Sequence, residues 1–105
     1  MVRAITDVAT VRADRAWGAR DLMEIDGATV RLHWTDQPYR WHVNDGSEVF
    51  VVLDGAVDMY FKRDGREDCV RLKPSDIFLA EAGDEHVAHP VGEARILVIE
   101  RKGSV

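Results

Sequence analysis

Apolar and polar residues alternate along most of the chain from position 20 onward, in short segments separated by turn residues. Segment 28–34 is the clearest case, because every second side chain is apolar, which is the pattern of a half-buried strand. The dipeptides Asp26-Gly27, Asp54-Gly55 and Asp64-Gly65 separate such segments and favour two-residue hairpin turns. We therefore predict about nine or ten short antiparallel strands and almost no helix, the pattern of an all-β sandwich or barrel.

The segment 49–53 is apolar at every position, so we expect a central strand that is covered on both faces. If Asp54-Gly55 closes a two-residue hairpin with segment 56–62, Glu48 lies opposite Phe61. Glu48 then shares one face with the apolar residues Phe50, Val52, Val57, Met59 and Phe61. A carboxylate on such a face is costly to bury unless another group pairs with it.

The remaining segments give weaker predictions. Residues 1–19 are expected to form an arm or an edge strand, with a short amphipathic helix over 10–17 as the alternative. Segment 86–89 should be a short strand that stops at Pro90, followed by a turn at Gly92. His33 falls on the polar face of its strand and His89 is not on the face of His86, so both are expected at the surface or behind the site.

Composition narrows the class of protein. The chain has 105 residues, the size of one domain, and 46% of them are hydrophobic, enough for a core. Its net charge of -5, with acidic and basic residues interleaved, argues against nucleic-acid and anionic-membrane partners. The single cysteine, Cys69, cannot form an intrachain disulfide, so we expect a reduced, cytoplasmic protein with Cys69 buried and inert.

Four polar residues are candidates for one site. His42 and Asn44 are two positions apart, so they share a face of a strand, and Glu48 follows them after a turn at Asp45-Gly46. His86 follows a Gly-Asp-Glu turn far downstream. Two imidazoles, a carboxylate and an amide can form one coordination sphere if the fold brings them together.

The sequence around these residues resembles the cupin superfamily, and in particular its small single-domain members, over about residues 28–100. The first cupin motif is His-x-His, three or four residues, Glu, six residues and Gly. Here His42, Glu48 and Gly55 fit the motif, and Asn44 replaces the second histidine. In the second motif Gly83 and His86 fit, whereas Ser75, Glu81 and Pro90 replace its Gly, Pro and Asn.

The resemblance implies a jelly-roll β-barrel with a pocket at one mouth. It also implies that His42, Asn44, Glu48 and His86 hold a divalent metal ion, either Fe, Mn, Ni or Zn. Two histidines and one carboxylate are the ligand set of non-haem Fe(II) oxygenases, although an amide oxygen is a weaker ligand than imidazole. The alternatives are a metal-free, hydrogen-bonded polar cluster and, for Asn44, an Asx turn into Asp45-Gly46.

A small organic ligand is the expected partner. Arg40, on the His42 side of its strand, could clamp an anionic group or form only a surface ion pair. Phe50, Met59 and Phe61 could line the pocket or only pack in the core. The resemblance implies metal-dependent isomerase- or dioxygenase-type chemistry. The alternative is a non-catalytic binding module, and the apolar segment 49–53 and the tryptophans also suggest a homodimer.

Overall fold

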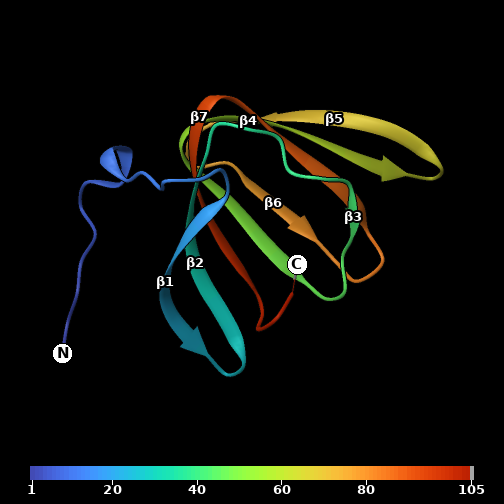
Figure 1. Cartoon of the computed structure of the whole chain (residues 1–105). Helices are drawn as coiled ribbons and strands as arrows, with labels where there is room; N and C mark the ends of the chain where they lie inside the picture. The colour runs from blue at the N-terminus through green and yellow to red at the C-terminus, as the bar shows by residue number, and fades with distance from the viewer. Residues whose placement is uncertain (105) are drawn as a thin grey trace.

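The computed structural model describes residues 1–104. They form one seven-stranded antiparallel sheet with the order β1-β2-β7-β4-β5, in which β3 also pairs with β7 and β6 with β4 (Figure 1). The elements are the 3-10 helix η1 (Val8–Thr10) and the strands β1 (Gly18–Ile25), β2 (Ala28–Thr35), β3 (His42–Val43), β4 (Glu48–Arg63), β5 (Arg66–Leu72), β6 (Ile77–Ala80) and β7 (Glu85–Arg101). Over residues 1–104 no helix has the length and apolar character needed to cross a bilayer.

Two long strands, β4 and β7, organise the sheet and pair with each other from Glu48↔Glu100 to Phe61↔His86. The predicted hairpin at Asp54-Gly55 is therefore wrong, because β4 continues through it with register shifts between Val52 and Ala56. Gly55 has a φ of +77, and a Cβ there would meet the backbone of Glu93 on β7. Because β7 supplies hydrogen-bond partners on both sides of this glycine, the chain bends as at a β-bulge and does not reverse.

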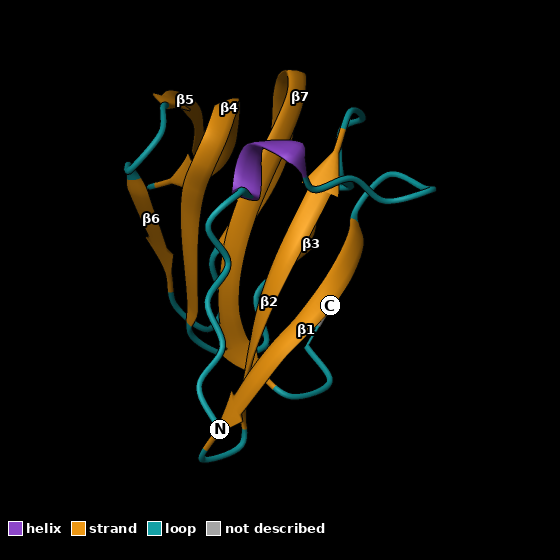
Figure 2. Cartoon of the chain, turned by 90° about the vertical axis from the view of Figure 1, so that its left-hand side faces the viewer, coloured by secondary structure: helices purple, strands orange, loops and turns teal. Residues whose placement is uncertain are grey.

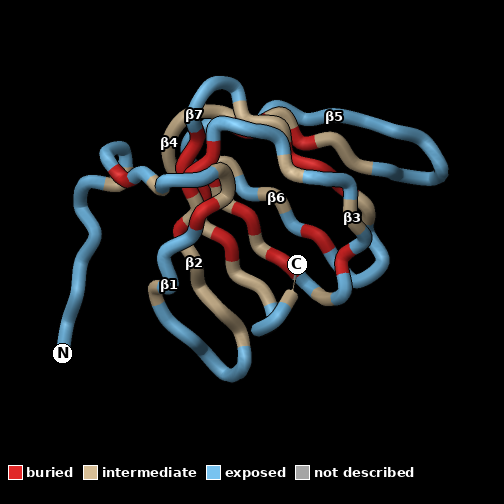
Figure 3. The backbone as a smooth tube through the Cα atoms, viewed as in Figure 1, coloured by how far each residue is buried: buried red, intermediate tan, exposed pale blue. Residues whose placement is uncertain are grey.

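The predicted stop at Pro90 is wrong for the same reason, since β7 also runs through its bend. Because both strands bend, the sheet folds over into two facing halves (Figure 2). Buried residues occur along β4, β7 and β2, whereas β5 and the N-terminal segment are mostly exposed (Figure 3). This arrangement confirms the predicted antiparallel jelly-roll barrel. Its largest core cluster comprises Phe50, Val52, Val57, Met59, Leu72, Ala88, Ala94, Ile96 and Val98.

The β1–β2 hairpin has the predicted turn and register, with Ile25 opposite Ala28 and Met23 opposite Val30. The two faces of β2, however, are reversed from our expectation, which placed the polar face with His33 toward the surface. Leu32 and Trp34 point to the outer side and are buried, and the guanidinium of Arg12 in the N-terminal segment lies 5.3 Å from the Trp34 ring. The polar face of β2 is therefore free to line the inside of the barrel.

The N-terminal segment is an arm that runs along the barrel rather than a helix. The alternative helix over 10–17 does not form, and Trp17 has a φ of 60, which no right-handed helix allows. Arg95, buried at 7% exposure, holds the arm by donating from Nε to the Val11 carbonyl at 2.8 Å. Its Nη1 also contacts Oδ2 of Asp54 at 3.1 Å, so the arm is tied to the bend of β4.

Two burial predictions are also wrong. Cys69 is exposed, because β5 is an edge strand with six of its seven residues exposed. The segment 49–53 is not covered on both faces, since Val49, Val51 and Leu53 are only half-buried.

Candidate metal centre and cavity

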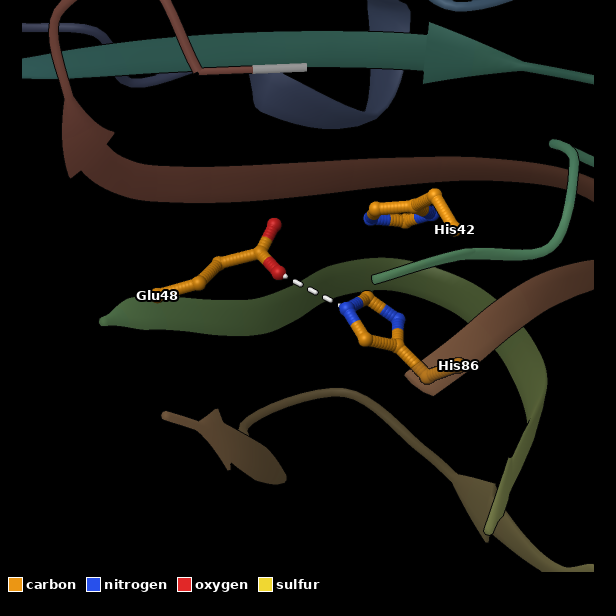
Figure 4. Close-up of side chains that lie close together, drawn as sticks. All are labelled: His42, Glu48 and His86. Atoms are coloured by element: carbon orange, nitrogen blue, oxygen red, sulfur yellow. Dashed lines mark ion pairs between the residues drawn. The ribbon is translucent and has the colours of Figure 1, made fainter. Parts of the chain in front are cut away.

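Pairing between β3 and β7 places His42 opposite His86, with ring centroids 4.4 Å apart. Glu48, the first residue of β4, approaches from the neighbouring strand, and its Oε1 lies 3.0 Å from Nε2 of His86 (Figure 4). One ligand atom from each of the three residues lies within 4.8 Å of the others. The fold therefore brings together three residues that are up to 44 positions apart in the chain (42 to 86).

Asn44 joins this cluster from the end of β3. Its Oδ1 lies 2.6 Å from Nε2 of His86, and its Nδ2 donates to Oε1 of Glu48 at 3.3 Å. The Nδ2 also donates to the Gly46 carbonyl at 3.3 Å. This bond is not the Asx turn of the alternative, in which the side-chain oxygen accepts from a backbone N–H, because Oδ1 of Asn44 faces His86. All four predicted residues therefore meet.

The electrostatics favour an ionised Glu48. Burial by itself would raise the pKa of this carboxyl, but the hydrogen bond and charge of His86, with the hydrogen bond from Asn44, outweigh it and lower the pKa. Burial raises the pKa of Glu100, the cross-strand partner of Glu48, to about 7, and repulsion from Glu48 adds to the shift. The two carboxyls therefore have opposite tendencies, one to stay charged and one to hold a proton.

The donor set fits a metal ion. Nδ1 of His42 lies 3.1 Å from the Arg40 carbonyl, which leaves Nε2 as the free nitrogen, the arrangement usual for a ligating histidine. Metal–ligand bonds of about 2.0–2.2 Å place two donors on opposite sides of an ion about 4.4 Å apart. The observed limit of 4.8 Å therefore requires only a small inward movement.

A cavity of about 260 Å³ opens beside this cluster. Of the four predicted ligand-contacting residues, only Phe50 lines it. Met59 is fully buried in the core, and Phe61 packs on Phe78, with ring centroids 5.9 Å apart, outside the lining. Arg40 is exposed and its guanidinium lies 5.0 Å from the Tyr39 ring, so the prediction that it clamps a ligand in the cavity is not supported.

Several lining residues were not predicted from the sequence: Arg15, Trp17, Arg31, His33, Tyr39 and Glu100. His33 was expected at the surface, but β2 turns its polar face inward, and burial lowers the pKa of this imidazole. The alternation of β2 carries the signal that Arg31 and His33 share a face. Only the pairing of β2 with β7 indicates that this face is the inner one.

Comparison with solved structures identifies the fold. A cupin-2 domain protein from Shewanella frigidimarina superposes with a TM-score of 0.75 at 25% identity, over 86% of this chain and 85% of its own. The chain folds as a small cupin domain. A cupin superfamily protein from Desulfitobacterium hafniense gives a TM-score of 0.78 at 16% identity, over 96% of this chain and 92% of its own.

The same fold occurs within larger enzymes. A hydroquinone 1,2-dioxygenase in complex with Fe3+ matches 87% of this cupin domain, which spans 29% of the enzyme chain, with a TM-score of 0.73 at 18% identity. Comparisons with protein-family models and with curated proteins found no match for the chain. The similarity of structure therefore establishes the cupin fold, and the activity has to be argued from the site.

Proposed function

We propose that this cupin domain binds one divalent metal ion through His42, Glu48 and His86, with the amide oxygen of Asn44 as a fourth ligand, and holds a small organic ligand beside it. The observation that carries the proposal is the set of three donor atoms within 4.8 Å at the base of a cavity. The iron-containing dioxygenase with the same fold supports it. Fe, Mn, Ni and Zn all accept such a mixed nitrogen and oxygen set.

The proposed chemistry is isomerase- or dioxygenase-type. When bound, the metal ion would polarise a substrate oxygen or activate dioxygen. Glu48 would serve as a ligand, and the cavity walls would position the substrate. Nδ1 of His86 is buried and has no hydrogen-bond partner within residues 1–104. This nitrogen would carry the proton when Nε2 binds an ion, so we expect a moderate metal affinity.

Metal content of untagged protein, measured by inorganic mass spectrometry after incubation with each ion, tests the proposal. We expect about one ion per chain, lost in His42→Ala and in His86→Ala. His89→Ala is the matched control, because this histidine packs against Tyr60, with ring centroids 4.8 Å apart, and lies outside the cavity lining. Equal metal contents in the three variants would overturn the assignment of the ligands.

The alternative is a metal-poor binding module without turnover. The observation that favours it is Asn44, which already satisfies His86 and Glu48 through hydrogen bonds and so stabilises the cluster without an ion. A comparison of the wild type with Asn44→His separates the two functions. If the site is a metal centre, the wild type binds Zn or Ni and the variant binds it more tightly, because imidazole is the stronger ligand. If the domain is a binding module, the wild type binds neither ion, and only the variant gains metal affinity.

We also propose that two copies of the domain associate through the outer side of the sheet. Cross-strand register lines up one apolar row there, Leu79–Val49–Ile99–Val30–Met23, and beside it a second, Ile77–Val51–Leu97, which ends at the buried Leu32. Leu79 is 68% exposed and Met23 is 58% exposed at the two ends of the first row. A second copy is the expected occupant, because an uncharged patch is complementary to itself across a two-fold axis.

Sedimentation velocity tests this association. We expect a mass of two chains for the wild type and of one chain for Leu79→Glu, which places a charge on the most exposed residue of the first row. Val70→Glu is the control, because Val70 is also exposed, at 40%, but lies on β5 and away from the rows. A wild type that sediments as one chain would refute the dimer and leave the metal proposal intact.

For location, we propose a reducing compartment such as the cytoplasm. Cys69 is exposed and is the only cysteine, so its thiol would be open to oxidation elsewhere. Cell fractionation of the native protein checks this.

A further inference from the structure

We propose that the ligand is a planar aromatic carboxylate, with its ring on Trp17 and its carboxylate at Arg31. This inference rests on the proposed function, because the other end of the ligand faces the metal centre. Neither residue belongs to the cupin motifs, and both line the cavity. Together they specify a ligand class that the motif residues leave open.

The first observation is a series of ring contacts that leads from Trp17 to the metal ligands. Trp17 lies 5.3 Å from Tyr39, and Tyr39 lies 5.3 Å from His42, each in an edge-to-face arrangement. His42 in turn lies 4.4 Å from His86. Flat faces and edges of this kind pair best with another flat ring, through stacked or edge-on contacts.

The second observation is that Trp17 is fixed in place before any ligand binds. Its φ of 60 is rare for a residue other than glycine. Its backbone carbonyl lies 3.1 Å from Nδ1 of His33, and its indole Nε1 donates to the Gln37 carbonyl at 2.9 Å. A strained backbone held by surrounding contacts is typical of binding sites, where it pre-organises a side chain.

The third observation is size. A dry cavity of about 150 Å³ is enough to hold benzene. The volume here, about 260 Å³, therefore accommodates one six-membered ring with small substituents.

The fourth observation is a positive charge in the cavity lining away from the metal centre. Arg31 lies opposite Val98, which lies opposite Phe50, so Arg31 is two strands and two residues from Glu48. At about 4.8 Å per strand and about 3.3 Å per residue, this corresponds to roughly 12 Å between the two backbone positions. A ring with an oxygen at one end and a carboxylate para to it reaches from a metal ion to this arginine. Nε of Arg31 contacts Oδ1 of Asp21 at 2.7 Å, and within residues 1–104 its Nη groups make no hydrogen bond. A carboxylate is a fitting partner for these free donors.

The metal ion adds to the attraction of the cavity for an anion. The charged lining residues are Arg15, Arg31, Glu48 and Glu100. A divalent ion adds positive charge beside the two arginines, so the affinity for a carboxylate should rise with the ion, whereas stacking on Trp17 should not depend on it.

Titration calorimetry on the full-length, metal-loaded protein tests the inference with four probes: 4-hydroxybenzoate, its cyclohexane analogue, 4-hydroxybenzamide and succinate. We expect 4-hydroxybenzoate to bind about two- to tenfold more tightly than each of the other three, since a ring contact is worth about 0.5–1.5 kcal/mol and 1.4 kcal/mol is tenfold. Trp17→Leu should remove the preference for the aromatic ring over cyclohexane. Arg31→Gln should remove the preference for carboxylate over carboxamide.

Trp41→Leu is the matched control, because Trp41 is 41% exposed and outside the cavity lining. Metal content is measured on every sample, so a protein without metal refutes the proposed function, whereas a metal-loaded protein without ring or carboxylate preference refutes this inference. If Trp17→Leu fails to fold, as circular dichroism would report, the probe series on the wild type decides alone, because equal affinities for all four probes overturn the assignment.

Discussion

Replacing Glu100 with glutamine should make the metal-free protein more stable at alkaline pH and leave it unchanged in acid. Burial and the charge of Glu48 raise the pKa of Glu100 to about 7 in the folded state, from 4.5. Between these values the unfolded chain has released the proton that the folded protein retains. The free energy of unfolding therefore falls as the pH rises from about 4.5 to about 7 and is constant above that.

The magnitude follows from the pKa difference. A change from 4.5 to about 7 corresponds to an upper limit of about 3.4 kcal/mol, at about 1.4 kcal/mol per pKa unit. Glu100 is only half-buried, so solvent screening reduces the penalty, and we expect about 1–2 kcal/mol. Glutamine has the shape and neutrality of the protonated acid and avoids this loss.

Urea unfolding in the presence of a chelator, at pH 4 and at pH 8, measures the effect. The free energies of wild type and Glu100→Gln should nearly agree at pH 4, below the unfolded pKa, and differ by about 1–2 kcal/mol at pH 8, with glutamine the more stable. Glu67→Gln, on the exposed strand β5, is the control and should follow the wild type. A difference between wild type and Glu100→Gln that is the same at both pH values would refute the reasoning. Added divalent ion should reduce the difference, because its charge offsets both carboxylates.

Four further substitutions test the core, the bend of β4 and a surface ion pair. Met59→Ala in the fully buried core should lower the free energy of unfolding by about 2–5 kcal/mol in a urea titration. Gly55→Ala should cost at least about 2 kcal/mol in the same assay, because strain at φ +77 adds to a clash with the backbone of Glu93. Gly65→Ala should cost less, since φ is +74 but nothing lies within 4 Å, and equal losses would exclude the clash. Asp58→Ala breaks the exposed ion pair with Arg71 and should lower the free energy of unfolding by at most about 1 kcal/mol, with only a slight fall in melting temperature. A loss of unfolding free energy near that of Met59→Ala would contradict this.

The sequence by itself determined the elements of this protein that depend on local spacing. Alternation and the Asp-Gly turns defined the β1–β2 and β4–β5 hairpins, because a two-residue turn fixes the pairing of the strands it joins. The spacing of His42, Asn44 and Glu48 placed three side chains near one another. His86 was assigned to the same cluster through the resemblance to the cupin motifs, and the β3–β7 pairing agrees with that assignment.

The tertiary structure alone decided how these elements face one another. Asp54-Gly55 has the same local signal as a hairpin turn, and only pairing with β7 along both halves of β4 makes it a bend. Period-two alternation shows that β2 has two faces but not which one lines the barrel, so His33 and Arg31 were assigned to the wrong side. Trp17 gives no periodic signal, because its position depends on contacts with His33 and Gln37, far along the chain. Local patterns encode which residues share a face, whereas the choice of inner face depends on free energies summed over partners distant in sequence.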